Sequence, residues 1–218
     1  MANVVITGAN RGIGLELTKI FTKRGDSVVA LCREASSALR ETGAKIIENF
    51  DVTNQESIDS LSEKIDGVDL LINNAGIFLN ETIQALDFDS IEKQFQVNTL
   101  APLKITMALI KNLNQGSKVC FVSSRMGSIS DNTSGSYYGY RMSKAGLNAF
   151  GKSLAMDLKG QGIAVALLHP GYVQTKMTGF NGEISPTEAA EGLSKRIDEL
   201  TLENSGGFWH SNGEQLPW

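Results

Sequence analysis

The sequence is poor in proline, cysteine and histidine, and each shortage narrows what the chain can be. Its 218 residues include four prolines, two cysteines and two histidines. With so few prolines and no like-charge run, nothing marks a linker, so we expect one domain over residues 1–218. Cys32 and Cys120 lie in apolar runs, which favours reduced, buried thiols. The scattered cysteines and histidines show no zinc spacing, so we expect no metal site.

The charge balance and the hydropathy pattern exclude further classes of protein. A net charge of -4 gives no support for nucleic acid or an anionic membrane as a partner. No apolar run approaches the roughly 20 residues that a membrane span needs. The chain enters an apolar stretch at Val4 without a basic leader, so we expect no signal peptide. Together with the reduced thiols, this predicts a cytoplasmic protein.

Short apolar stretches alternate with amphipathic stretches of helical length. We expect strands at 3–6, 27–32, 45–50, 69–73, 118–123 and 163–169, with a short late strand near 206–209. We expect helices at about 12–24, 54–66, 87–112, 138–159 and 186–201. Strands rich in valine, isoleucine and leucine on both faces suit a parallel sheet covered on each side. The pattern predicts an α/β fold: a single doubly wound Rossmann domain with a mostly parallel sheet of about seven strands.

Glycine is abundant, with 22 residues, and three glycines follow the first predicted strand. Glycine lets a phosphate approach the main chain closely. A helix that begins near Gly12 would point its free N–H groups and its positive end at that phosphate. Because the cluster follows a strand and opens a helix, it predicts a dinucleotide site. The residues that we expect to hold the dinucleotide here are Gly8, Asn10, Arg11, Gly12, Ile13 and Gly14.

Tyr140 and Lys144 are four residues apart in a segment expected to be helical, so they share one face. A phenol titrates near pH ~10, and a neighbouring ammonium favours the phenolate. The pair therefore has the composition of an acid–base device. Tyr137 and Tyr138 are rivals for this role. Only Tyr140 has a lysine four residues later, so we choose Tyr140.

The glycine spacing Gly-x-x-x-Gly-x-Gly resembles that of the short-chain dehydrogenase/reductase family. Further matches occur in order along the chain. Ser124 ends the fifth predicted strand, and Asn98 lies inside a predicted helix. The resemblance implies that Asn98, Ser124, Tyr140 and Lys144 are catalytic. It also implies that the cofactor contacts Asn74, Ala75, Gly76, Tyr140, Lys144, Pro170, Gly171, Val173 and Thr175.

The family resemblance implies a mechanism as well. Hydride from the nicotinamide reaches a carbonyl carbon while Tyr140 donates a proton to the oxygen and Ser124 steadies the charge there. Lys144 lowers the pKa of Tyr140 and holds the nicotinamide ribose. Asn98 anchors a water through which Lys144 is re-protonated.

The end of the second predicted strand indicates which nicotinamide cofactor is bound. An acid there would bind the ribose of NAD, but the position is occupied by Cys32. Arg33 suits the 2'-phosphate of NADP, with Arg11 as a second partner. Glu34 leaves NAD(H) open, because a shift of one residue would restore an acid. We prefer NADP(H).

At the end of the third predicted strand, the resemblance places Asp51 and Val52 beside the adenine. A plain helix N-cap is the alternative for Asp51.

The tail, at 206–209 and 213–218, resembles a narrower branch, the C-factor and sniffer-type carbonyl reductases. This implies an NADPH-dependent oxidoreductase that reduces a small carbonyl compound, such as an aldehyde, ketone or quinone. The alternative is an NADP-binding signalling or regulatory protein of C-factor type with little catalysis. A third possibility, a sugar epimerase or dehydratase, is disfavoured because those relatives usually carry a substantial extra C-terminal substrate domain.

The resemblance also implies a homo-dimer or homo-tetramer that pairs through helices 87–112 and 138–159. It implies a brief, open substrate lid at 176–185.

Overall fold

The computed structural model describes residues 1–218 and contains one sheet of seven strands. All strand pairs are parallel, in the order β3-β2-β1-β4-β5-β6-β7. The strand order reverses between β1 and β4, which creates a crevice at their carboxyl ends. The strands are β1 (Asn3–Thr7), β2 (Ser27–Leu31), β3 (Lys45–Ile47), β4 (Val68–Asn73), β5 (Leu113–Val122), β6 (Ala164–His169) and β7 (Gly207–His210). The predicted doubly wound α/β fold is confirmed.

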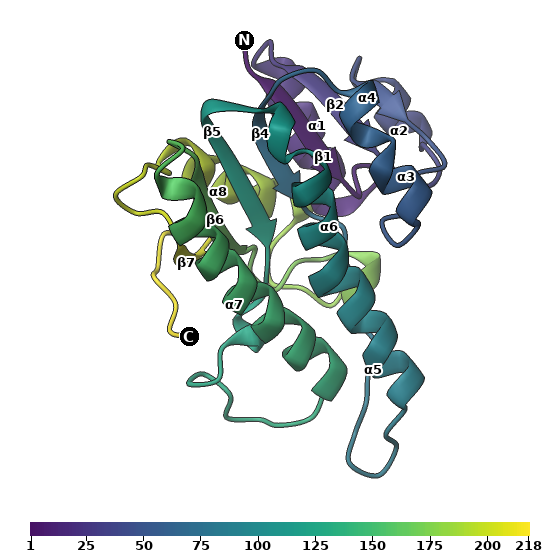
Figure 1. Cartoon of the computed structure of the whole chain (residues 1–218). Coiled ribbons are helices and arrows are strands. Elements are labelled where there is room, and N and C mark those ends of the chain that lie inside the picture. Colours follow the sequence, from purple (N-terminus) through teal and green to yellow (C-terminus); the bar gives the residue numbers. More distant parts are fainter.

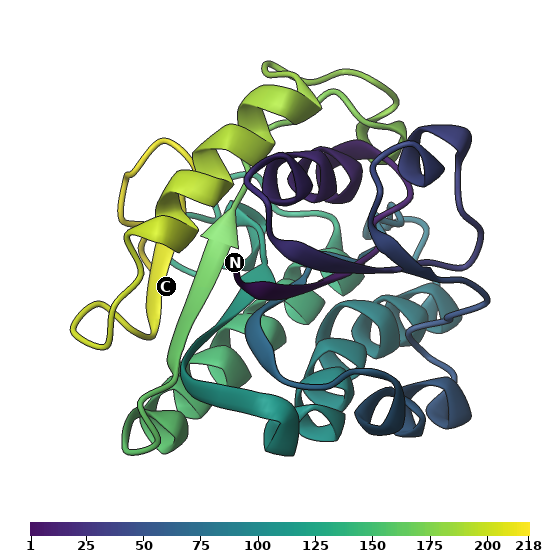
Figure 2. The same cartoon turned by 90° about the horizontal axis from the view of Figure 1, so that it is seen from above.

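Helices cover both faces of the sheet, as the two views show (Figures 1 and 2). One face carries α1 (Gly12–Lys23), α2 (Ser37–Arg40) and α8 (Pro186–Asp198). The other carries α3 (Gln55–Asp59), α4 (Leu61–Lys64), α6 (Ala101–Ala108) and α7 (Tyr138–Lys159), with α5 (Phe88–Phe95) beside α7. None of these helices has the length and apolarity needed to cross a membrane.

Strand residues alternate between two apolar cores. Val4 and Ile6 of β1 pack with Leu17 of α1 in one core. Val5, between them, packs with Leu147 of α7 in the other. This period of two explains why the strands read as continuous apolar runs. Because both faces are packed, the strands hold the loops at their carboxyl ends in fixed positions.

Several predicted elements differ from the structure. Strand β5 begins at Leu113 rather than 118, and helix α8 ends at Asp198 rather than 201. The helix expected at 87–112 is divided by a π-helical turn over Gln96–Leu100, which separates α5 from α6. The helix expected at 54–66 is two short helices, α3 and α4. Strand β3 ends at Ile47 because Asn49 has φ 56°, a left-handed conformation that a strand cannot accommodate.

Candidate active site

The loops that follow β1 and β4 are joined by hydrogen bonds at the crevice. The Thr7 hydroxyl accepts hydrogen bonds from the backbone N–H groups of Asn74 and Ala75, each at 3.0 Å. In return, the Asn74 amide donates to the carbonyls of Thr7 at 3.0 Å and Gly8 at 3.3 Å. Thr7 is not among the site residues expected from the sequence. The one feature of the sequence that points to Thr7 is its position directly before Gly8.

The glycine loop packs too closely for larger side chains. A Cβ on Gly14 would collide with the Gly8 carbonyl and lie 2.6 Å from the Asn74 amide nitrogen. Gly12 has φ +54° and lies against the Thr175 methyl, so the loop after β6 reaches the glycine loop. Helix α1 begins here without a side-chain cap and without an acidic residue in its first turn. Its N–H groups and positive end are therefore available to a dinucleotide phosphate.

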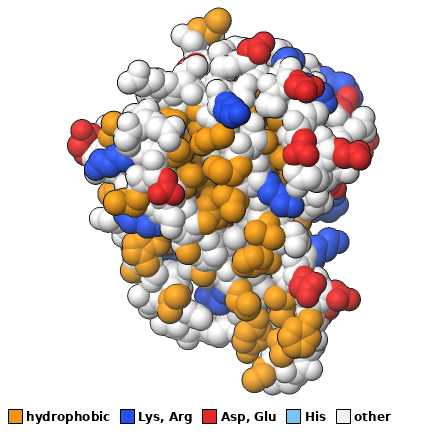
Figure 3. Space-filling model, viewed as in Figure 1, with side chains coloured by type: hydrophobic (Ala, Val, Ile, Leu, Met, Phe, Trp, Pro, Cys, Tyr) orange, Lys and Arg blue, Asp and Glu red, His pale blue; other side chains and the backbone are white.

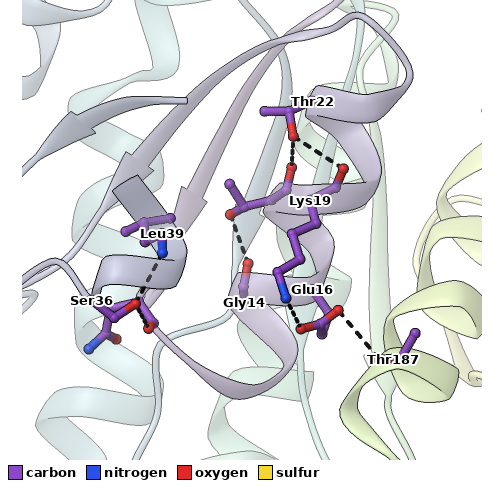
Figure 4. A network of polar contacts seen from close by, with 9 residues as sticks. Gly14, Glu16, Lys19, Thr22, Ser36, Leu39 and Thr187 are labelled. Carbon is purple, nitrogen blue, oxygen red and sulfur yellow. Dashed lines mark hydrogen bonds and ion pairs between the residues drawn. The ribbon is translucent and has the colours of Figure 1, made fainter. Parts of the chain in front are cut away.

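Side chains outside the glycine loop hold it in place (Figure 4). The Ser36 hydroxyl donates to the Asn10 carbonyl at 2.8 Å and also caps α2. Inside α1, the Thr18 hydroxyl donates to the Gly14 carbonyl at 2.8 Å. Asn10, Arg11 and Ile13 thus lie in one braced turn, and the residues present fit a dinucleotide.

The outer end of the crevice has the features expected for NADP. Cys32 is buried at the end of β2, and no carboxylate stands at that position. Arg33 and Arg11 are exposed, and neither takes part in an ion pair. Hydrogen bonds from Thr53 lower the pKa of Asp51, and the Arg33 charge adds to this effect. Asp51 therefore stays negative beside a free guanidinium.

Asp51 closes a tight turn and does not cap a helix. Its carboxylate accepts from the Thr53 N–H at 2.8 Å and the Thr53 hydroxyl at 2.7 Å. The N-cap of α3 is Asn54. Val52, between Asp51 and Thr53, packs against the core beneath α3. The N-cap alternative for Asp51 is therefore wrong.

Helix α7 carries Tyr140 and Lys144 one turn apart, facing the end of β5. Asn98, Ser124, Tyr140 and Lys144 have 0%, 6%, 9% and 4% of their surface exposed. The Lys144 ammonium lies 5.8 Å from the centre of the Tyr140 ring and donates to the Val122 carbonyl at 2.8 Å. The four groups are thus buried together at the carboxyl edge of the sheet.

Burial dominates the acid–base properties of the pair. It raises the pKa of Tyr140 to about 12, an effect that a hydrogen bond with the Ser124 side chain opposes. Burial lowers the pKa of Lys144 to about 8. The expected lowering of the Tyr140 pKa by Lys144 is wrong in direction for this structure, because desolvation of the buried phenol prevails.

Asn98 lies in the π-helical turn and ties the cofactor loop to α7. Its carbonyl oxygen accepts from the Ile77 N–H at 2.9 Å, and its amide donates to the Ile77 carbonyl at 2.9 Å and the Ser143 hydroxyl at 3.0 Å. A Cβ on Gly76 would lie 3.2 Å from the Asn98 oxygen and 3.7 Å from the Lys144 nitrogen. The loop thus meets the candidate catalytic groups. π-Helical turns are frequent at functional sites.

The loop after β6 forms the remaining wall. Pro170 and Val173 are buried, and Val173 bridges to Ile184. Gly171 has φ +95°, a conformation that favours glycine. Tyr172 is 51% exposed. The loop therefore combines a fixed base with an open outer side.

His169 lies at the end of β6, beside the candidate site. Its Nδ1 atom is buried without a partner, and the ring lies edge-on to that of His210 at 4.8 Å. Burial, together with the charges of His210, Arg125 and Lys144, lowers the pKa of His169 to about 3. It is therefore neutral near pH 7.

Comparisons with known proteins agree with this geometry. A family model described as short chain dehydrogenase matches residues 2–184. The 1-hydroxy-2-glutathionyl-2-methyl-3-butene dehydrogenase of Rhodococcus sp. is 42% identical, with 100% of both chains covered. The C-signal of Myxococcus xanthus is 42% identical over 154 residues, covering 69% of this chain and 93% of that protein.

Among solved structures, the carbonyl reductase Sniffer of D. melanogaster superposes with TM-score 0.93 at 30% identity, over 100% of both chains. The NADPH-bound carbonyl reductase from chicken fatty liver gives TM-score 0.91 at 29% identity, over 100% of this chain and 99% of that one. Together with the glycine loop and the buried tyrosine and lysine on α7, these matches show that the chain belongs to the short-chain dehydrogenase/reductase family.

Proposed function

We propose that the chain is an NADPH-dependent oxidoreductase that reduces the carbonyl group of a small molecule, with Tyr140 as the proton donor. The observation that carries the proposal is the burial of Ser124, Tyr140 and Lys144 in one cluster, with the ammonium close to the Gly76 loop. A protein that only senses a nucleotide has no need of a buried proton donor.

The protonation states of the cluster suit reduction near neutral pH. When bound, NADPH supplies the hydride to the carbonyl carbon. With a pKa of about 12, Tyr140 is fully protonated and can donate to the carbonyl oxygen. Ser124 hydrogen-bonds the same oxygen and stabilises its developing charge. With a pKa of about 8, Lys144 can both release and regain a proton near pH 7, so it can re-protonate Tyr140.

The choice of NADP(H) rests on the outer end of the crevice. Cys32 cannot accept hydrogen bonds from a ribose as a carboxylate does, and the exposed Arg33 suits a phosphate. The chicken carbonyl reductase, similar over the full length of this chain, holds NADPH. Arg11 is placed to add a second positive charge at this end.

A second candidate substrate class is an alcohol carried on a glutathione conjugate, oxidised with NADP⁺. The relative from Rhodococcus, 42% identical over 100% of both chains, is named for that kind of substrate. The same groups serve this direction in reverse order: Tyr140 first passes its proton to neutral Lys144, and the phenolate then receives the proton of the alcohol. The C-signal relative keeps open a regulatory protein of C-factor type, but its 42% identity covers only 69% of this chain.

We also propose that the chain forms a homo-dimer or homo-tetramer through α5, α6 and α7. Apolar side chains gather on the face of the molecule over these helices (Figure 3). Phe95, Met107 and Met142 are 37%, 42% and 55% exposed there. Light scattering of the purified protein checks this, and a monomer at micromolar concentration would contradict it.

The test of function is NADPH oxidation, followed by absorbance, with quinones, aromatic aldehydes and diketones. NADH is run in parallel, as is NADP⁺ reduction with an S-hydroxyalkyl glutathione. We expect turnover of carbonyl compounds with NADPH and much weaker turnover with NADH. Activity on the glutathione conjugate alone would select the second candidate. Tight NADPH binding without any turnover would contradict both and favour the regulatory role.

A further inference from the structure

Glu81 is a buried acid that the proposed reaction does not use. It lies between β4 and α5 with 1% of its surface exposed, and no lysine or arginine is paired with it. Its carboxylate accepts hydrogen bonds from the Ser90 hydroxyl at 2.6 Å, the Gln94 amide, and the Gly139 N–H at 3.2 Å. A buried carboxylate without a cationic partner is costly unless hydrogen bonds satisfy it. The donors that contact Glu81 therefore indicate its role.

Gln94 fixes the orientation of this carboxylate. The Leu79 N–H donates to the Gln94 oxygen at 2.9 Å, which turns the Gln94 NH₂ group toward Glu81. Gln94 lies one turn before Asn98, which holds Ile77. Two fully buried amides on one helix face thus fix the segment that runs from the cofactor loop to Glu81.

Glu81 also holds a strained start of helix α7. Ser136 and Tyr137 have φ of 54° and 57°, a left-handed conformation that costs about 1–2 kcal/mol per non-glycine residue. The Tyr137 N–H donates to the Glu81 carbonyl at 2.9 Å, while the Glu81 carboxylate accepts from Gly139. Tyr137 provides no side-chain cap, so Glu81 caps the 22-residue helix from another segment, with its negative charge at the positive end.

The residue that follows Gly139 is Tyr140. A Cβ on Gly139 would lie 2.9 Å from the Ile91 Cα and 3.0 Å from the Glu81 carboxylate, so only glycine permits this close approach. Phe78, on the same segment as Glu81, contacts the Tyr140 ring edge-on at 4.9 Å. The segment therefore holds both the backbone before Tyr140 and the phenol itself.

We propose that Glu81 is a positioning residue: by capping α7 it sets the phenol of Tyr140 at hydrogen-bonding distance from Ser124 and from the substrate oxygen. The proposal rests on the proposed function for its kinetic test, but the position of the helix can also be measured without substrate.

The test exchanges the two partners, Glu81 and Gln94. In Glu81→Gln the new NH₂ group must face either the Gln94 NH₂ group or the Gly139 N–H, both of which are donors, and in Gln94→Glu two carboxylates face each other. The double variant, which carries both substitutions, restores the hydrogen bond between the two side chains with the donor and acceptor reversed, and the Gly139 N–H keeps an acceptor.

We expect each single variant to lose about 10- to 100-fold in kcat, as misplacement of a reacting group by up to ~1 Å does. We expect kcat of the double variant to recover to within about threefold of the wild type, because the two side chains act through their mutual hydrogen bond, a coupling that a double-mutant cycle detects. We expect the KM for NADPH to stay constant in all three variants.

Ile163→Val is the matched control for simple loss of stability. Ile163 is buried at the opposite end of the sheet, so its variant should lower the melting temperature and leave kcat unchanged. Hydrogen exchange of the peptide 136–144 gives the readout that needs no substrate. We expect faster exchange in both single variants and normal exchange in the double variant.

Unchanged hydrogen exchange of the peptide 136–144 in Glu81→Gln would overturn the proposal. A double variant whose exchange and kcat are no closer to the wild type than those of either single variant would also overturn it. If the wild type turns over no carbonyl compound, the proposed function fails while the exchange data still decide the role of Glu81.

Discussion

The cluster that we propose as catalytic and the segment after β6 form two sides of the candidate site with opposite physical character. Asn98, Ser124, Tyr140 and Lys144 are each at most 9% exposed and belong to hydrogen-bonded helices and strand ends. Tyr172, Met177 and Phe180, on the other side, are 51%, 44% and 68% exposed. Buried groups hold one geometry, whereas exposed side chains on a loop can adapt. We therefore propose that the first side carries the chemistry and that the second selects the substrate.

Lys144→Met should give the largest effect, because it removes the proton supply from the buried side. We expect kcat to fall at least about 100-fold, the lower end for acid–base groups. Lys144 also affects stability, because its burial makes the free energy of unfolding depend on pH. The pKa of Lys144 is about 8 in the folded chain against 10.5 when unfolded, so the unfolded chain binds more protons between these values and stability rises with pH.

The matching measurement is urea unfolding at pH 8 and pH 10. The wild type should gain about 2 kcal/mol from Lys144 over this range, and the methionine variant should not. An equal gain in both proteins would show that the lysine is not desolvated as described.

Gly14→Ala should weaken the fold and the cofactor loop together. Its methyl group would meet the Gly8 carbonyl and the Asn74 amide, so we expect a loss of about 1–3 kcal/mol in unfolding free energy and at least a tenfold weaker Kd for NADPH. Gly160→Ala is the control, because a Cβ there meets no atom and φ is -65°. Calorimetry measures both the unfolding free energy and the Kd for NADPH. Equal values of these quantities in the two variants would contradict the close packing of the loop.

His169→Gln should remove a source of acid sensitivity. The pKa of His169 is about 3 in the folded chain and 6.5 when unfolded, so the unfolded chain takes up the proton first. The contribution of His169 to the free energy of unfolding is present above pH 6.5 and falls by about 2 kcal/mol when the pH is lowered to 5. Urea unfolding at pH 7.5 and pH 5 should therefore show a smaller decrease for the variant. A decrease as large as in the wild type would place His169 in contact with water.

Phe180→Ala should give the smallest effect, because it changes only the exposed side. We expect the KM for bulky carbonyl substrates to change by a few-fold and kcat for a small aldehyde to stay within about twofold, the scale of a partly exposed apolar contact. Steady-state kinetics with one large and one small substrate measure this. A loss of kcat with both would mean that the segment also positions the catalytic groups.

The fold and most of the site follow from local pattern in the sequence. Strand positions appear as apolar runs because both sheet faces are packed, and the glycine loop appears because its spacing is set by steric contacts. The structure places Tyr140 beside Ser124, whereas Tyr137 has a left-handed backbone at the helix start. The choice of Tyr140 over Tyr137 as the proton donor stays a prediction, and it rests on the lysine four residues later.

Other features depend on contacts between distant residues, which no local pattern records. The π-helical turn exists where Asn98 pairs with Ile77, 21 residues earlier. Glu81 resembles any loop acid until the structure shows Gly139, 58 residues later, donating to it. The pKa of Tyr140 was predicted in the wrong direction because the sequence shows the neighbouring charge but not the extent of burial.

The most direct test is Tyr140→Phe, with kcat and the Kd for NADPH measured on the same preparation. We expect kcat to fall by about 10²- to 10⁴-fold, because the proton donor is lost. We expect the Kd for NADPH to stay within about twofold of the wild type, because the glycine loop is braced independently by Thr7 and Asn74. A variant that keeps more than about a tenth of wild-type kcat would contradict the assignment of chemistry to the buried side.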